Sequence, residues 1–451
     1  MTILYCARWI LPICSPPIEE AAIAVEGEEI VAVGSRSSLT VEFPEATLRD
    51  FGEAAIIPGL VNAHSHLELT ALRGFLENEE TDFFAWLRKL TVARLERMTA
   101  DDLYVSALWG ACEAVRAGVT CVGDSSDSAC ESMTALRQIG LRGVVFQESF
   151  GPDPKLVQEN LEKLKFNISR LRERETSLLK AGVSPHAPYT VSGPLLESIA
   201  DFASAEKLPL MMHAAESAAE ETFMREGRGP FATGLAKRGI TWTAQHTSTI
   251  DYLAKRGILR TKPLLAHCVN VDDADIYALK ETGARIAHCP KSNAKLGHGR
   301  APLASFLQAE IAVGLGSDSV ASNNICDLLE EARFAILTAR TGTELALQRN
   351  LRSEEAIRIA TTGGARALGF EDQVGALKQG FKADFAIVSL ERTQQLPSFD
   401  PFSTLVFASS ARDVIFTAVA GKEVYDEGCV RNVDEQRLRR RMNEVSENLR
   451  S

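Results

Sequence analysis

The stretch PGLVNAHSHLELT, Pro58 to Thr70, places two histidines, His64 and His66, one residue apart. The whole chain of 451 residues contains only eight histidines. Because alternate side chains of an extended strand point to the same side, both imidazoles would face one point in space. Such a pair is either a buried polar pair or half of a metal site. A metal site needs further ligands from elsewhere in the chain.

Eight β-rich runs, separated for the most part by helical segments, occupy the long middle of the chain. They cover residues 56–64, 119–124, 142–147, 181–186, 209–213, 263–268, 284–289 and 312–318. The segments 101–118 and 156–174 between them carry apolar residues at helical spacing. Eight parallel strands with crossover helices are typical of a (β/α)8 TIM-like barrel, which we expect over residues 58–372.

The two ends of the chain have a different pattern, with short β-rich runs and turns. Residues 19–34 read as two strands around a glycine turn, and 383–390 and 414–426 again read as strands. No convincing helix is predicted in residues 1–57. Since neither end alone offers much core, we expect residues 1–57 and 373–451 to build one small β-sandwich, followed by a terminal helix.

The composition limits the classes of function. The chain is 45% hydrophobic and 24% charged, as in ordinary globular proteins, and its net charge of −11 disfavours nucleic-acid or anionic-membrane partners. Its nine scattered cysteines include no CxxC pair, which argues against a disulfide framework and favours the cytoplasm. No segment is apolar for long enough to span a membrane. We expect a cytoplasmic protein with a small-molecule partner, and the sequence leaves a homo-oligomer open.

Six of the eight histidines fall at or just beyond the ends of the predicted strands. They are His64, His66, His186, His213, His267 and His288, and Asp318 ends the last strand. In a barrel, the carboxyl ends of all strands surround one mouth, where catalytic groups gather. Residues spread over some 250 positions of the chain therefore converge.

Imidazole and carboxylate groups in this arrangement predict a single divalent metal ion. Zn²⁺ suits them best, with Fe²⁺ as the alternative. We assign His64, His66, His213 and Asp318 as its ligands, with one position left for a water whose pKa falls to ~7. Three residues after His213, Glu216 is placed to act as a general acid or base. Otherwise Glu216 would be an exposed glutamate at a helix start.

At this point the chain resembles a known family through several motifs. They are PGLVNAHSHLE, SPHAPYTVS, HAAES, HCPKSNAKLGHGRAPL and GLGSDSVASNN. Together they resemble the amidohydrolase superfamily, in its cytosine-deaminase-like branch of aminohydrolases and chlorohydrolases, over nearly the whole chain. The resemblance implies that Glu216 shuttles protons, that His267 lies beside the reacting centre and that His186 contacts substrate. The absence of a lysine at the end of the fourth strand argues for one metal ion.

The resemblance implies hydrolytic loss of ammonia from an amino-heterocycle. The HLE triplet and the segment FFAWLRKL are similar to those of aminodeoxyfutalosine deaminases, which act on an adenine nucleoside. Deaminases of S-adenosylhomocysteine and 5′-methylthioadenosine share the metal motifs. Glu68, Trp86 and His298 are candidate substrate contacts. Alternatively, Trp86 is a core residue, Glu68 a capping or ion-pairing carboxylate and His298 a solvated side chain.

Three other functions stay open at this stage. With the same fold, the protein could instead release ammonia from guanine. It could also release halide from a chlorotriazine. A catalytically inactive scaffold protein is the distant alternative. It would be expected to lack some of the ligands, yet all four and Glu216 are present.

Overall fold

The computed structural model describes residues 1–341 and 351–450. The middle of the chain forms two parallel sheets of four strands each, in sequential order. The first contains β6 (Leu60–Ser65), β7 (Val119–Ser126), β8 (Arg142–Ser149) and β9 (Leu179–Pro185); the second contains β10 (Met211–Ala214), β11 (Leu264–His267), β12 (Arg285–His288) and β13 (Val313–Leu315). Each of the eight predicted β-rich runs overlaps one of these strands, so the predicted α/β fold with parallel strands is confirmed.

The two parallel sheets are linked to each other at both edges. A parallel bridge joins Ser65 to Asp318, and another joins Val183 to Leu210. At the first link, the Asp318 amide donates a 2.9 Å hydrogen bond to the His64 carbonyl. The carboxyl ends of all eight strands consequently lie at the same end of the assembly.

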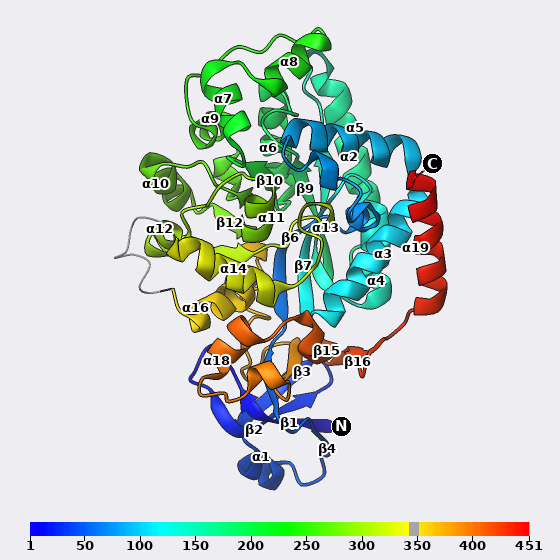
Figure 1. Cartoon of the computed structure of the whole chain (residues 1–451), viewed down its shortest axis with the longest axis vertical. Coiled ribbons are helices and arrows are strands. Elements are labelled where there is room, and N and C mark those ends of the chain that lie inside the picture. The colour runs from blue at the N-terminus through cyan, green and yellow to red at the C-terminus, as the bar shows by residue number, and fades with distance from the viewer. Residues whose placement is uncertain (342–350, 451) are drawn as a thin grey trace.

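Helices surround these strands (Figure 1). They are α2 (Phe83–Arg97), α3 (Ala100–Arg116), α4 (Ala129–Ile139), α5 (Val157–Arg172), α6 (Gly193–Glu206), α7 (Ala218–Glu226), α8 (Pro230–Lys237), α9 (Thr249–Lys255), α10 (Asp273–Thr282), α11 (Pro290–Lys295), α12 (Leu303–Gln308), α13 (Val320–Asn323), α14 (Leu328–Arg340), α16 (Ser353–Arg358) and α17 (Gly364–Leu368). The predicted helices over 101–118 and 156–174 are α3 and α5. A reciprocal cap between Thr99 and Asp102 starts α3, whose apolar face is buried.

Both ends of the chain contribute to one nine-stranded sheet. Its strands are β1 (Thr2–Ile10), β2 (Ile18–Glu26), β3 (Glu29–Ser35), β4 (Thr47–Asp50), β5 (Ala54–Pro58), β14 (Phe385–Ser389), β15 (Val414–Val419), β16 (Lys422–Asp426) and β17 (Cys429–Val430). The two ends meet where β5 pairs antiparallel with β14. Tyr5, Phe385 and Phe416 pack together in the core of this sheet. The short helix α18 (Pro401–Ser403) follows β14, and α19 (Glu435–Arg450) packs along α3 (Figure 1).

Two details of the sequence prediction are wrong. The run 56–64 is not one strand, because β5 ends at Pro58 in the nine-stranded sheet and β6 begins at Leu60 in the parallel sheet. A Cβ atom at Gly59, between them, would lie 2.0 Å from Thr120 Oγ1, so the junction requires glycine. Residues 1–57 also contain a helix, α1 (Arg36–Glu42), which is capped by Ser35 and buries only Leu39. A single buried side chain leaves no apolar periodicity to detect.

A fully buried ion pair connects the parallel sheets to the C-terminal strands. Arg142, the first residue of β8, donates to both carboxylate oxygens of Asp384 at 2.9 and 3.0 Å. The exposed fractions of the two side chains are 1% and 0%. Asp384 also accepts the amide of Ala420 at 2.8 Å. The ion pair therefore connects β8 of the parallel sheets to the segment that leads into β14.

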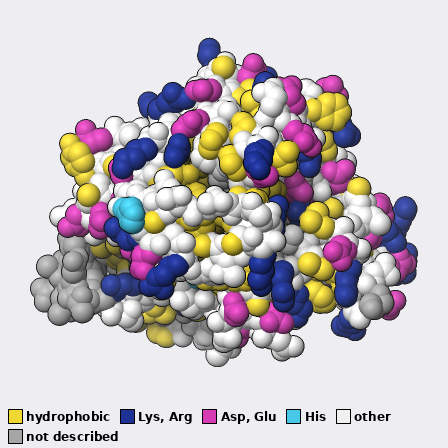
Figure 2. Space-filling view, turned by 90° about the horizontal axis from the view of Figure 1, so that it is seen from above, with side chains coloured by type: hydrophobic (Ala, Val, Ile, Leu, Met, Phe, Trp, Pro, Cys, Tyr) yellow, Lys and Arg dark blue, Asp and Glu magenta, His cyan; other side chains and the backbone are white. Residues whose placement is uncertain are grey.

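Figure 2 shows the molecule from above the view of Figure 1, with hydrophobic side chains lying between lysine, arginine, aspartate and glutamate side chains of both signs. Among the described residues, no helix has the length and apolar character that a membrane crossing requires.

Candidate active site

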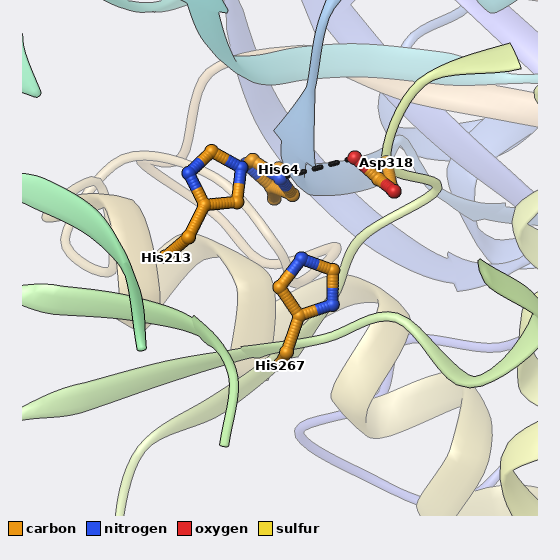
Figure 3. A group of neighbouring side chains, drawn as sticks. All are labelled: His64, His213, His267 and Asp318. Atoms are coloured by element: carbon orange, nitrogen blue, oxygen red, sulfur yellow. Dashed lines mark ion pairs between the residues drawn. The ribbon is translucent and has the colours of Figure 1, made fainter. Parts of the chain in front are cut away.

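Five side chains from four strand ends converge at the mouth of the parallel sheets. His64 lies in β6, His66 directly follows it, His213 lies in β10, His267 ends β11 and Asp318 follows β13. All five are buried. The ligand atoms of four of them, His64, His213, His267 and Asp318, lie within 4.8 Å of one another, and Figure 3 shows these side chains around a common point. His66 reaches the same point through its contacts with His213 and Asp318.

The spacing of these atoms suits a metal ion. His66 Nε2 lies 3.2 Å from His213 Nε2, and Asp318 Oδ1 lies 3.3 Å from His64 Nε2 and 3.6 Å from His66 Nε2. Ligand atoms that bind zinc tetrahedrally at 2.0–2.1 Å are roughly 3.3–3.4 Å apart. Among the described residues, neither ring nitrogen of His64 has a hydrogen-bond partner. The residues present therefore fit a bound divalent ion.

Hydrogen bonds on the far side of the ligands fix their orientation. His213 Nδ1 donates to the His186 carbonyl at 2.9 Å, which leaves Nε2 with its lone pair toward the centre. The hydroxyls of Ser292 and Ser322 both donate to Asp318 Oδ2 at 2.6 Å, so that Oδ1 is the oxygen that faces the histidines. Partners of this kind orient metal ligands.

The backbone bends sharply where the strands end. Ala215, His267 and Asp318 have φ angles of +52°, +71° and +55°, a left-handed conformation that residues other than glycine rarely adopt. Such conformations cluster at functional sites, where the surrounding structure holds them in place. Here they accompany the turns after β10, β11 and β13 that carry the converging side chains.

Burial keeps His64, His66 and His213 uncharged. It lowers the pKa of His64 and His66 and brings the pKa of His213 to about 4. Neutral imidazole is the form that binds metal ions. Burial opposes ionisation of Asp318, yet His64 and His267 hold the pKa of its carboxyl well below the usual range. The site thus presents neutral nitrogen donors and one carboxylate at neutral pH.

Glu216 lies beside this group and is only 4% exposed. Its Oε1 is 3.6 Å from His267 Nε2 and 3.4 Å from His298 Nε2, and the Tyr189 hydroxyl donates to its Oε2 at 3.4 Å. Burial would raise the pKa of Glu216, but His267 and His298 lower it more. The carboxylate of Glu216 is therefore ionised and faces the same space as the converging histidines.

His267 is oriented by Asn293, whose Oδ1 lies 2.8 Å from His267 Nδ1. Burial disfavours the charged imidazole, but Glu216 and Asp318 raise the pKa of His267. Its Nε2 faces Glu216 across 3.6 Å. His267 is thus linked both to the group of possible ligands and to Glu216.

A cavity of about 530 Å³ opens next to these residues. Its wall includes His66, Glu68, Trp86, Arg94, Glu148, His186, His213, Glu216, His267 and Asp318. Leu95, Phe150 and Leu156 also line it and are large, exposed apolar side chains. The volume lies in the range of small-molecule sites.

The candidate substrate contacts have different surroundings. Trp86, on α2, is buried, stacks on Phe83 and lines the cavity. His186 lines the cavity with its Nδ1 2.9 Å from the Thr190 hydroxyl. His298 is buried against the Phe83 ring and approaches Glu216 rather than solvent.

Glu68 lines the cavity but has several protein partners. It accepts the hydroxyl of Ser126 at 2.5 Å and the amides of Asp127 and Ser128 at 3.1 and 2.9 Å. Arg94 lies 3.5 Å from it and donates to Asp127 at 2.8 Å. Glu68 thereby fixes the segment after β7 at the edge of the cavity.

Sequence reasoning missed Glu148, the second-last residue of β8. It is 7% exposed and lines the cavity, and its Oε1 has no hydrogen-bond partner among the described residues. This oxygen lies 3.9 Å from His66 Nδ1, and Glu148 forms a second group of possible ligands with His186 and His213. Since Glu148 directly follows the predicted strand 142–147, the rule that selected the histidines would also have found it.

Two further histidines take no part in this group. His288, at the end of β12, is buried, and burial lowers its pKa to about 4. His246 lies outside the helices and strands, in the connection between α8 and α9.

Comparisons with known proteins agree on the family. The model of the amidohydrolase family matches residues 55–424. A 5-methylthioadenosine/S-adenosylhomocysteine deaminase of Pelotomaculum thermopropionicum is 34% identical over 421 residues, which cover 93% of this chain and 92% of the relative.

Solved structures resemble the whole chain. An adenosine deaminase from Xanthomonas campestris with bound zinc is 26% identical, with a TM-score of 0.86 over 99% of this chain and 98% of that one. The aminofutalosine deaminase of Helicobacter pylori is 22% identical, with a TM-score of 0.78 over 94% of this chain and 100% of that one. At 22% identity, the similarity to the aminofutalosine deaminase shows only that the two chains share a fold.

Proposed function

Because the chain belongs to the amidohydrolase family, we propose that it is a metal-dependent hydrolase that releases the amino group of an adenine nucleoside as ammonia. The observation that carries the proposal is the position of Glu216, buried between His267 and His298 at the edge of the metal-binding group. Relatives named as deaminases of adenine nucleosides support the same reaction class.

We assign His64, His66, His213 and Asp318 as the residues that hold one zinc ion, with Fe²⁺ as the alternative metal. Zinc is the ion named with the similar Xanthomonas adenosine deaminase. When bound, the ion supplies a Lewis acid and a water molecule of lowered pKa. His267 is left to the reacting groups because its Nδ1 is engaged by Asn293 and its Nε2 faces Glu216.

Different side chains then carry out the separate proton transfers of the hydrolysis. Glu216, ionised before the reaction, takes one proton from the water that attacks the amino-bearing carbon and passes it to the neighbouring ring nitrogen. His267, in its charged form, donates a hydrogen bond to the oxygen that adds. Asp318 Oδ1 accepts the second proton of the former water and passes it to the amino group, the carbon–nitrogen bond breaks, and ammonia leaves. General acid–base catalysis of this kind typically contributes ~10²–10⁴-fold.

The outer cavity favours a nucleoside over a free base. Glu148 offers an acceptor oxygen without a partner among the described residues, and Arg94 is already engaged by Asp127 and Glu68. A group that donates hydrogen bonds, such as the ribose hydroxyls, satisfies this wall. The apolar side chains of Leu95, Phe150 and Leu156 at the rim suit an apolar part of a 5′-substituent.

We further propose the finer architecture that this site requires. The two parallel sheets close into one (β/α)8 barrel over residues 58–372, supported by the bridges that link Ser65 to Asp318 and Val183 to Leu210. Residues 1–57 and 373–451 form the accessory β-sandwich. A cytoplasmic location is supported by the nine cysteines, all of which are free.

The test is ammonia release by the zinc-loaded protein from a small panel. The panel contains 5′-methylthioadenosine, S-adenosylhomocysteine, aminodeoxyfutalosine, adenosine, guanine and a chlorotriazine, and the last is also scored for chloride. We expect at least one adenine nucleoside to be deaminated with clear preference. Release of chloride alone, or turnover of guanine alone, would contradict the proposal.

A further inference from the structure

The segment between β10 and α7 carries Glu216 in an unusual backbone conformation. Ala215, the residue before Glu216, has a φ angle of +52° although it is not a glycine. The amides of Ala215 and Glu216 donate hydrogen bonds of 2.8 and 2.9 Å to the two carboxylate oxygens of Glu220. One side chain therefore holds the backbone on which the proposed proton shuttle is mounted.

Glu220 is buried and hydrogen-bonded to several neighbouring segments. It is 0% exposed, and besides the two amides its Oε1 accepts the hydroxyl of Thr249 at 3.0 Å. Thr249 begins α9, so Glu220 connects three segments: the turn after β10, α7 and α9. A buried carboxylate with three hydrogen-bond donors has a defined position.

An ordinary helix cap does not account for these contacts. The N-cap of α7 is Ser217, whose hydroxyl accepts the amide of Glu220 at 3.2 Å. In a capping box, the third helical residue would reach back to the amide of the N-cap residue itself. Glu220 instead reaches the two residues before the cap, Ala215 and Glu216. Its side chain therefore fixes the turn rather than the helix end.

We propose that Glu220 is a positioning residue that aims Glu216 at the reacting atoms. The inference rests on the proposed function, since it assigns Glu220 a role through the proton shuttle. Glu216 Oε1 lies 3.6 and 3.4 Å from its two histidine neighbours, distances that a shift of the turn would change directly. A misplacement of about 1 Å at a reacting group can lower a rate about 10²-fold.

The experiment is a double-mutant cycle between the two glutamates. Glu220→Gln keeps the shape of the side chain but replaces one acceptor oxygen by an NH₂ donor. In the wild-type background we expect kcat to fall roughly 10- to 100-fold, with KM and bound zinc unchanged. In the Glu216→Gln background the same change should have an effect of less than about twofold, because there is no shuttle left to aim. Equal losses in both backgrounds, or no loss in either, would overturn the proposal.

The chain offers a matched control next to Glu220. Glu221 is a half-exposed neighbour on α7 that pairs with Arg225, and Glu221→Gln should leave kcat unchanged. Thr249→Val is a milder second variant, since it removes one of the three donors to Glu220. It should lower kcat in the same direction but less, and an unchanged kcat in both Thr249→Val and a folded Glu220→Gln would overturn the proposal.

Amide hydrogen exchange separates this inference from the proposed function. If the wild-type protein deaminates none of the adenine nucleosides, the proposed function fails, but the positioning of the turn can still be measured. Glu220→Gln should raise the exchange rates of the Ala215 and Glu216 amides at least about tenfold, and Glu221→Gln should not. Unchanged exchange at these two amides would overturn the role of Glu220.

Discussion

His66 Nε2 lies 3.2 Å from His213 Nε2, although 147 positions separate the two residues in the chain. Burial lowers the pKa of both imidazoles, so both are neutral at pH 7. His213 Nδ1 is already used as a donor to the His186 carbonyl, which leaves its Nε2 as an acceptor. Two ring nitrogens at this distance, beside Asp318 and His64, have the arrangement of ligands to a common cation.

Removal of the carboxylate of Glu216 tests the proton shuttle. Glu216→Gln should lower kcat by ~10²–10⁴-fold, because the amide cannot carry a proton to the ring nitrogen. Bound zinc, measured by elemental analysis, should stay at the wild-type amount, since Glu216 is not assigned as a ligand. A variant that keeps its metal and the full rate would show that another group moves the proton.

The serine pair behind Asp318 tests how the aspartate is held. Ser322→Ala removes one of the two 2.6 Å hydrogen bonds to Asp318 Oδ2 and should weaken zinc binding by about 10- to 100-fold. Competition with a chelator of known affinity measures this change. Ser292→Ala should act in the same direction. An unchanged zinc affinity in both variants would mean that the serines do not orient this ligand.

Discrimination between ribose and deoxyribose tests the role of Glu148. The wild-type protein should prefer the ribonucleoside over its 2′- or 3′-deoxy analogue by roughly 2- to 10-fold in kcat/KM, the value of an ordinary hydrogen bond, because burial raises the pKa of the Glu148 carboxyl well above its usual range. Glu148→Ala should erase most of this preference.

The exposed Glu159 on α5, changed to Gln, is the matched control for Glu148 and should leave the preference intact. Because Glu148 Oε1 is only 3.9 Å from His66 Nδ1, bound zinc is measured in each variant. If Glu148→Ala lowers kcat/KM equally for the ribonucleoside and its deoxy analogue, Glu148 acts through His66 and does not contact the sugar.

The buried ion pair between Arg142 and Asp384 should dominate the link between the parallel sheets and the C-terminal strands. Asp384→Ala leaves an uncompensated buried guanidinium and should lower the free energy of unfolding by about 3–5 kcal/mol, measured by denaturant titration. Glu221→Ala, which breaks an exposed pair with Arg225, should change it by only about 0–1 kcal/mol. A loss below 1 kcal/mol for Asp384→Ala would contradict this account.

The residues at the strand ends were predictable because the carboxyl ends of parallel strands lie at the same edge of a sheet. Histidines placed directly after apolar runs had to share one end of the sheets, and five separate strands obey this rule. The start of β6 was harder to predict from the sequence, because the chain passes from the nine-stranded sheet to the parallel sheet at Gly59. Only the close approach of Thr120 reveals why a glycine stands there.

The walls of the site were harder to predict than its centre. Glu68 has the sequence context of a substrate contact, yet the amides of Asp127 and Ser128 reach it only once β7 and α4 are in place. Ser292 and Ser322 lie within quoted motifs and Glu220 lies just after one, but the motifs do not show which residues these side chains contact. Their roles follow from distances between segments far apart in the chain, and spacing along the chain does not encode such distances.

The metal dependence of ammonia release tests the proposed deaminase most directly. The protein is stripped with a chelator and assayed with the preferred adenine nucleoside, and zinc is then returned in steps. We expect ammonia release to be lost on stripping and to be restored in full at one ion per chain. Ammonia release that persists in metal-free protein would contradict the account at its centre.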